Sequence, residues 1–589
     1  MGRSGEQGPS SPPGLRCDTN LQRLRNRSFA GPFTGARFTD EVMRVPLFAR
    51  ALAGLAGAAH IAAPRLLWLP QDLDGPGVDL QVSVPAFTIV GVVALVGAAL
   101  AGRFPTIGTT LLTTGAVVST FGTVWAFEPV VALLSIPLLV AAALLLLGRG
   151  EPIRPVAGRR ALLGAFAVGG YVVWRMLATF EERSRPNTPE SSVTKPRWAA
   201  DWLWVGGVRP DRARVTAAGL SSARQRCTYW ADGEERRWVE ATPDRAGVAR
   251  FELPDLQPGT RHHYRVDRAD GVASTGAADA TFRTPPAGAH DVTIAFGSCA
   301  WTGSNGAVFD AIRAVEPSVF VHLGDLHYGN LTSPRPDDHL ALMTRALSTP
   351  AQSALFNSVP SAWVWDDHDF GPNDSDSSSA SRDAALRNYR RTVPDWGVQT
   401  DPDAPITQAF TIGRVRVVIT DTRSQRTPST MLGADQEAWL IDELVTSARS
   451  HALVVWANPS PWNVPDRPGS DQWGGFPQER RRIANAIADA QISNLVMISG
   501  DWHLAAIDDG TNTDFSDAGT GGFPLIHGAP FDRPGARTGE TYSHGVFSNA
   551  GQFGSVRVAD DGGNRVQVTL TCHLWTGEEL GAHSFTVDV

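Results

Sequence analysis

Two kinds of apolar pattern divide the chain. Five long apolar runs stand in the N-terminal third, roughly at 46–63, 85–102, 106–127, 129–147 and 161–180. Each run approaches the ~20 residues with which a helix crosses a bilayer. After residue 197 the apolar positions form short runs bounded by Gly, Pro and Asp, which is typical of β-strands. The pattern predicts an all-α transmembrane region at 45–180, followed by domains rich in strands.

The basic residues indicate how this region is oriented. Residues 1–44 are rich in Gly, Ser, Pro and Arg, which indicates a disordered cytoplasmic tail without a cleaved signal peptide. Arg residues also gather in the loop between the fourth and fifth runs, whereas the loop at 66–84 has no basic residue. Because basic loops stay in the cytoplasm, we expect a multi-pass cell-membrane protein whose large C-terminal part lies outside the cytoplasm. Arg175 must snorkel in the fifth span, and without that span this part would be cytoplasmic.

A linker and a small β domain are predicted next. Residues 181–196 are charged and contain Pro, as linkers do. Residues 197–286 alternate apolar and polar positions in short runs, which predicts an antiparallel β-sandwich. The segment at 256–266, Leu-Gln-Pro-Gly-Thr-Arg-His-His-Tyr-Arg-Val, resembles the corner of fibronectin type III-like domains. The resemblance implies a buried Tyr264 and a structural role for the domain.

One arrangement recurs between residues 287 and 589, where an apolar strand ends in polar residues. Strands are predicted at 292–296, 319–323, 362–365, 415–420, 453–457 and 495–499. The residues that follow them include Cys299, Asp325, Asp366 to Asp369, Asp421, Arg423, Asn458, Asp501 and His503. Ligands of open α/β sheets bind beyond the carboxyl ends of the strands. So many charges are costly to bury unless a metal ion compensates them, so we expect an α/β domain with a metal site.

Five segments resemble, in order, the motifs of PhoD-like alkaline phosphatases, a family of the calcineurin-like metallophosphoesterases. They are Gly-Ser-Cys, Gly-Asp-x-x-Tyr, Trp-Asp-Asp-His-Asp, Asp-Thr-Arg and Ser-Gly-Asp-x-His, which begin at 297, 324, 365, 421 and 499. The resemblance covers roughly residues 200–589. It implies a metallophosphoesterase-type sandwich of two β-sheets flanked by helices, with two metal ions at the strand ends.

The resemblance also implies a set of metal ligands: Cys299, Asp325, Tyr328, Asp367, Asn458, Asp501 and His503. Asp325 would bridge the two ions, and Cys299 and Tyr328 would bind Fe³⁺. The second ion would be Ca²⁺, although other divalent metals would also suit oxygen ligands, and Asp367 would bind it. Asn458 and Asp501 are further candidates for that ion, and His503 could bind either one.

Two residues receive catalytic roles from the same resemblance. His368 would contact the phosphate and protonate the leaving group. Arg423 would stabilise the negative charge of the phosphate. The polar segment at 373–381 is expected to form a flexible loop beside the site.

These features favour a membrane-anchored phosphoester hydrolase that cleaves phosphomonoesters, phosphodiesters or both with a metal-activated hydroxide. One alternative is a phospholipase D-like phosphodiesterase that acts on phospholipids. Another is a membrane sensor or scaffold that has lost catalysis. The net charge of −8 does not favour nucleic-acid binding. Cys227 and Cys572 could form a disulfide outside the cell, but the spacing alone does not decide this.

Overall fold

The structure, a computed structural model, describes residues 188–196, 198–270, 278–536 and 542–589. The predicted tail and the five predicted membrane spans lie between residues 1 and 180, outside the described residues, and they stay predictions. Among the residues that the structure does describe, no helix is both long and apolar enough to span a bilayer.

The first seven strands form two antiparallel sheets that enclose a core. One sheet has the strand order β1-β2-β5 and the other the order β4-β3-β6-β7. The bounds are β1 Trp202–Arg209, β2 Arg212–Ala218, β3 Gln225–Ala231, β4 Arg237–Ala241, β5 Ala249–Leu253, β6 Arg261–Arg268 and β7 Ala280–Arg283. Burial alternates along β3, as expected where one face of a sheet packs on a core and the other faces solvent. Tyr264 on β6 lies fully buried in this core, as the sequence predicts.

This sandwich packs directly on the α/β domain. Trp204 on β1 is fully buried, and its indole N–H donates to the carbonyl oxygen of Ser361 at 3.0 Å. The ring of Trp204 also meets the ring of Phe356, with 4.8 Å between the centroids. The Asp395 carboxylate accepts hydrogen bonds from two arginines of the sandwich, Arg214 at 2.9 Å and Arg250 at 2.8 Å. The sandwich therefore shares buried surface with the domain that carries the candidate site.

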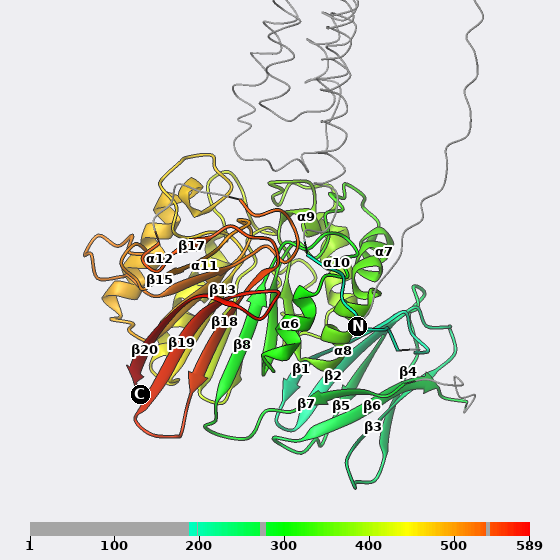
Figure 1. Cartoon of the computed structure of the whole chain (residues 1–589). Helices are drawn as coiled ribbons and strands as arrows, with labels where there is room; N and C mark the ends of the chain where they lie inside the picture. Colours follow the sequence, from blue (N-terminus) through cyan, green and yellow to red (C-terminus); the bar gives the residue numbers. More distant parts are fainter. Residues whose placement is uncertain (1–187, 197, 271–277, 537–541) are drawn as a thin grey trace, which may run out of the picture. The chain divides into compact units, whose positions relative to one another are not determined.

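The α/β domain contains two sheets. The six-stranded sheet has the order β10-β9-β8-β18-β19-β20, and the seven-stranded sheet has the order β11-β12-β13-β14-β16-β15-β17. Figure 1 shows the C-terminal strands β18, β19 and β20 beside β8, far from them in sequence. The first sheet consists of β8 Val292–Gly297, β9 Val319–Leu323, β10 Ser361–Val364, β18 Gln552–Ala559, β19 Arg565–Leu574 and β20 Glu579–Asp588. The second consists of β11 Gln408–Ile412, β12 Val415–Ile419, β13 Leu453–Asn458, β14 Leu495–Ser499, β15 Ala505–Asp508, β16 Leu525–Gly528 and β17 Val546–Phe547.

Helices complete the domain and explain why its strands are apolar throughout. They are α6 Val308–Ala314, α7 Pro336–Leu347, α8 Pro350–Ser358, α9 Asp367–Phe370, α10 Arg382–Thr392, α11 Ala434–Ala448 and α12 Pro477–Asp489, with a 3₁₀ turn at Trp473–Gly475. Val417 on β12 belongs to the core shared by the two sheets, whereas its neighbour Val418 belongs to a second core with Leu440 of α11 and Ile483 of α12. Both faces of the strand are therefore buried, so its sequence does not alternate between apolar and polar.

The strand register places the candidate residues at matching ends of the sheets. Strands β8, β9 and β10 run parallel to one another, and so do β12, β13 and β14. The carboxyl ends of parallel strands lie at the same edge of their sheet. All six strands predicted for this domain are present within a residue or two of their predicted bounds.

The possible disulfide between Cys227 and Cys572 is not formed. Both side chains are free thiols and fully buried. Cys227 packs in the core of the sandwich, whereas Cys572 packs in the core of the two large sheets. Each cysteine therefore acts as a small apolar core residue.

Candidate metal centre

Three of the candidate ligands stand on strained backbone at strand ends. Cys299 after β8, Asp325 after β9 and Asp501 after β14 have φ angles of 66°, 55° and 67°. This left-handed region is unfavourable for residues that have a Cβ atom, and it persists where the surrounding structure enforces it. The strain occurs at the same kind of position in three strands. Such clusters are typical of functional sites.

Gly324 allows the Asp325 turn to approach the neighbouring strand end. A Cβ atom at Gly324 would lie 2.4 Å from Cβ and 2.5 Å from the backbone nitrogen of Asp366. Its φ of 94° also favours glycine. The sequence Gly-Asp thus brings the ends of β9 and β10 together.

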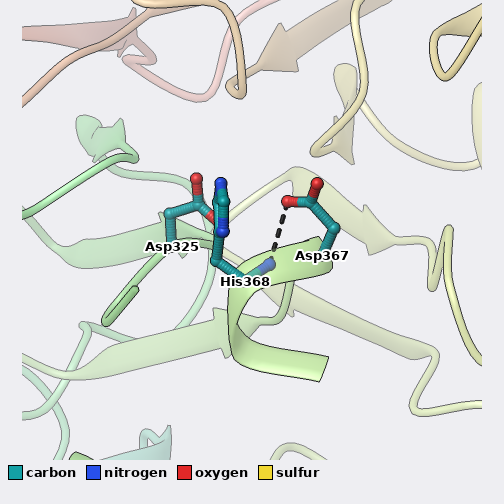
Figure 2. Close-up of side chains that lie close together, drawn as sticks. All are labelled: Asp325, Asp367 and His368. Atoms are coloured by element: carbon teal, nitrogen blue, oxygen red, sulfur yellow. Dashed lines mark hydrogen bonds between the residues drawn. The ribbon is translucent and has the colours of Figure 1, made fainter. Parts of the chain in front are cut away.

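Asp325, Asp367 and His368 form the centre of the site. Each offers a donor atom, these atoms lie within 4.8 Å of one another, and all three residues are buried. Figure 2 shows the three side chains pointing to the same side, with Asp325 after a strand and the other two at the start of α9. The Asp367 carboxylate accepts hydrogen bonds from the backbone N–H of His368 at 2.9 Å and of Asp374 at 2.7 Å.

The two carboxyl groups of this centre differ in pKa. Burial raises the pKa of Asp325 to about 6, and the negative charge of the neighbouring Asp367 raises it further. His368 and a hydrogen bond from Tyr328 act in the opposite direction and lower this pKa. Burial also acts on Asp367, but His368, Arg423 and two backbone N–H groups outweigh it and lower its pKa to about 2. Asp367 is therefore held as an anion while Asp325 binds a proton more readily.

A second group of donors adjoins Asp325. The Cys299 sulfur lies 3.6 Å from Oδ2 of Asp325 and 3.3 Å from the backbone oxygen of Asp501. The hydroxyl of Tyr328 lies 3.1 Å from Nε2 of His503. Burial raises the pKa of the Cys299 thiol, and the carboxylate of Asp325 raises it further. The structure thus brings together thiol, phenol, imidazole and carboxyl groups from three strand ends.

Buried carboxyl oxygens at this site fit the binding of a metal ion. Within the described residues, Oδ1 of Asp325, Oδ2 of Asp366 and Oδ2 of Asp501 are buried without a hydrogen-bond partner. A buried oxygen without a partner lowers stability, and a bound cation would satisfy it. Thiolate and phenolate donors favour a transition metal, whereas carboxylates suit a hard cation.

The other two predicted site residues have partners of their own. The side-chain amide of Asn458 donates to the backbone oxygen of Ser460 at 2.5 Å, and its oxygen lies 3.4 Å from the hydroxyl of Thr420. The guanidinium of Arg423 is fully buried and donates to two carboxylates, Asp366 at 2.5 Å and Asp471 at 2.8 Å. Arg423 thus orients Asp366, which precedes the ligand candidate Asp367.

Sequence reasoning did not assign several residues that touch this site. Asn330 lies 2.6 Å from Nδ1 of His368, and Asp374 and Asp471 lie within 4.8 Å of Asp367 as a further acidic group. Asp374 belongs to the polar segment at 373–381, which lies beside the site as expected. The backbone N–H of Asp374 donates to Asp367 and the hydroxyl of Ser381 donates to the carbonyl oxygen of Phe370, so two hydrogen bonds join the segment to α9, and its flexibility stays a prediction.

Part of the chain is similar to known proteins. Residues 294–544 match the model of the PhoD-like phosphatase family. Alkaline phosphatase D from Bacillus subtilis (strain 168) is 24% identical over 319 residues, which are 45% of this chain and 54% of that protein. The chain thus spans about half the length of this curated relative. Both matches are to proteins described as phosphatases.

Two solved structures are similar to this chain. A structure of PhoD matches with a TM-score of 0.52 and 18% sequence identity, over 68% of this chain and 90% of that chain. The purple acid phosphatase PPD1 from yellow lupin (Lupinus luteus) seeds matches with a TM-score of 0.46 and 12% identity, over 68% of this chain and 75% of its own. The first likeness shows that the predicted α/β fold with two sheets is correct.

Proposed function

We propose that the chain is a metal-dependent phosphoester hydrolase whose reaction centre is formed by Asp325, Asp367 and His368. The observation that carries the proposal is the convergence of these three buried donors within 4.8 Å of one another. The unpartnered oxygen of Asp325 and the family match over residues 294–544 support it.

The residues present fit two different metal ions. Cys299, Tyr328 and Asp325 would hold Fe³⁺, and Asp367 with Asp325 would hold Ca²⁺ or another divalent ion. Asn458 and Asp501 would complete the second set, and His503 could join either set. When bound, the two ions would supply Lewis-acid polarisation of the phosphate and activation of a water molecule.

His368 would supply the proton for the leaving group. Its Nδ1 lies 2.6 Å from Oδ1 of Asn330, and an Nδ1–H donated to that oxygen leaves Nε2 to carry the mobile proton. In the reaction, an oxygen from water would bond to phosphorus while the ester P–O bond breaks, and the proton that this water loses would pass to solvent. The departing alkoxide would take the proton from Nε2, and the imidazole would regain a proton from solvent before the next turnover. A phosphomonoester then gives an alcohol and inorganic phosphate, and a phosphodiester gives an alcohol and a phosphomonoester.

Arg423 would act at the edge of this centre. It holds Asp366 and Asp471 through its guanidinium, and this contact would fix the turn that presents Asp367. A direct contact between Arg423 and the phosphate stays a prediction.

The predicted membrane region would anchor the enzyme with its reaction centre outside the cytoplasm. This part of the proposal rests on the apolar runs and the Arg distribution of residues 1–180. Protease added to intact cells would then cleave the α/β domain, whereas a cytoplasmic domain would be protected. The same anchoring favours a second candidate, a phospholipase D-like enzyme that cleaves phospholipid diesters near the bilayer.

A direct test is hydrolysis by the full chain supplied with iron and calcium, with the bound metals measured alongside. A chromogenic phosphomonoester and the matching diester would be compared. Turnover of either substrate supports the hydrolase, and a preference for the diester favours the phospholipase-like alternative. Protein that holds both metals but hydrolyses neither substrate would contradict the proposal and favour an inactive sensor or scaffold.

A further inference from the structure

Arg533 lies between two aromatic rings beside the candidate metal centre. Its guanidinium carbon is 4.0 Å from the ring centroid of Trp301 and 4.0 Å from that of Tyr328. Only 3% of its surface is exposed. A desolvated guanidinium over an aromatic face is attracted by the π electrons more strongly than an exposed one.

The backbone around Arg533 is fixed independently of this contact. The backbone N–H of Phe531 donates to the carbonyl oxygen of Ser298 at 3.0 Å. The Asp532 carboxylate accepts the backbone N–H of Trp301 at 2.8 Å and also binds the hydroxyl of Ser304. These bonds tie the segment to the turn that carries Cys299, so Arg533 approaches Tyr328 from a rigid support.

The orientation of the Tyr328 ring matters because the ring and its hydroxyl both contact other residues of the centre. That hydroxyl lies 3.1 Å from Nε2 of His503. The ring contacts His368 as well, with 4.2 Å between the ring centroids. A tilt of the ring would therefore disturb several groups of the centre at once.

We propose that Arg533 is a positioning residue for Tyr328, which it holds in the orientation for metal binding while placing a positive charge against its ring. This inference rests on the proposed function, in which Tyr328 binds Fe³⁺ as a phenolate. A cation beside the ring stabilises the electrons of the phenolate. It therefore raises the energy at which an electron moves from phenolate to iron.

The test uses the absorption band of the iron–phenolate pair in the full chain loaded with Fe³⁺. Arg533→Met removes the charge at similar side-chain length, so the band should move to longer wavelength and iron binding should weaken about tenfold. Arg533→Lys keeps the charge but loses the planar contact, and its band should lie between those of wild type and Arg533→Met. A thermal melt establishes that each variant is folded.

Arg236 provides a matched control, since its guanidinium carbon lies 4.4 Å from the ring centroid of Trp230 in the sandwich. Arg236→Met should leave the band unchanged. A wild-type band that Arg533→Met does not shift would overturn the role of Arg533 and leave the hydrolase intact. Iron-loaded wild type without any such band would overturn Tyr328 as a ligand and, with it, this inference. If iron-loaded wild type shows the band but hydrolyses no phosphoester, the result would count against the proposed function and not against the role of Arg533.

Discussion

Nε of Arg423 lies 2.5 Å from the carboxylate of Asp366, and both side chains are fully buried. The pair links two sheets, because Asp366 follows β10 of the six-stranded sheet and Arg423 follows β12 of the seven-stranded one. Asp471 binds the other edge of the guanidinium through both of its oxygens, each at 2.8 Å. A charged network thus joins the two sheets directly behind Asp367.

Replacement of Arg423 by Met should destabilise the protein strongly. It leaves buried carboxylates without their cation, so the free energy of unfolding should fall by about 3–5 kcal/mol. Chemical denaturation measures this change. Arg557→Met is the control, because Arg557 pairs with Asp291 at 3.4 Å on the exposed surface and should change the free energy by less than about 1 kcal/mol. Equal effects of the two substitutions would contradict the role of the buried network.

Replacement of Trp204 by Ala should loosen the sandwich from the α/β domain. The fully buried ring fills space against Phe356 and donates to Ser361, so a loss of about 3–5 kcal/mol is expected in urea denaturation. Trp238→Ala is a matched control, since Trp238 is 56% exposed and should matter far less. If the Trp204→Ala variant is as stable as Trp238→Ala, the contact between the sandwich and the α/β domain does not stabilise the folded protein.

Asp532 should make stability depend on pH. Burial raises the pKa of Asp532 to about 6. Hydrogen bonds from Ser304 and from the Trp301 backbone lower this pKa but do not outweigh the effect of burial. The folded state therefore binds this proton more tightly than the unfolded chain, whose Asp has a pKa near 3.9. The stabilising contribution is fully present below about pH 4 and is lost as the pH rises through 6.

Asp532→Asn keeps the hydrogen-bonding shape but removes the titrating group. From pH 4 to pH 7, Asp532 should lower the free energy of unfolding of the wild type by up to about 3 kcal/mol. The variant lacks this group, so its free energy of unfolding should fall by that much less over the same range. Denaturation curves of both proteins at several pH values measure the difference. Identical pH dependence of the two proteins would contradict the account of Asp532.

His368→Asn should separate proton donation from metal binding. Turnover of an alkyl phosphate should fall about 10²–10⁴-fold, because the alkoxide loses its proton donor. An aryl phosphate, whose leaving group needs no proton, should be affected much less. Metal content measured on the same samples serves as the control. Equal losses on both substrates would show that His368 does not act as the acid.

The sequence predicted the parallel strands well because each is a short apolar run followed by Gly, Asp or Asn. The strand pattern alone could not separate Asp325 from Asp421, because each stands just after an apolar strand, and only the family resemblance distinguished them. In the structure Asp421 accepts hydrogen bonds from the Trp365 indole at 2.8 Å and from the Ile406 backbone at 3.1 Å. Those partners come from distant segments, so Asp421 is satisfied where an oxygen of Asp325 is not.

Other parts of the site left no local signal. Asp471 and Arg533 lie in loops without apolar periodicity, and only the folded chain brings them to Arg423 and Tyr328. The three C-terminal strands were also not predicted individually, since β18 pairs with β8 across most of the domain. Pairings between segments so far apart depend on the whole fold and not on the residues beside them.

The most direct test of the account is Asp325→Asn in the full chain, with bound metal and phosphoester hydrolysis measured on one preparation. Asn removes the charge of the carboxyl group that is proposed to bind both metal ions, and it changes the side-chain shape very little. Asp291→Asn, at an exposed position, is the control. The account predicts that Asp325→Asn loses both tight metal binding and hydrolysis while the control keeps both. An Asp325→Asn protein that retains its metals and its activity would contradict it.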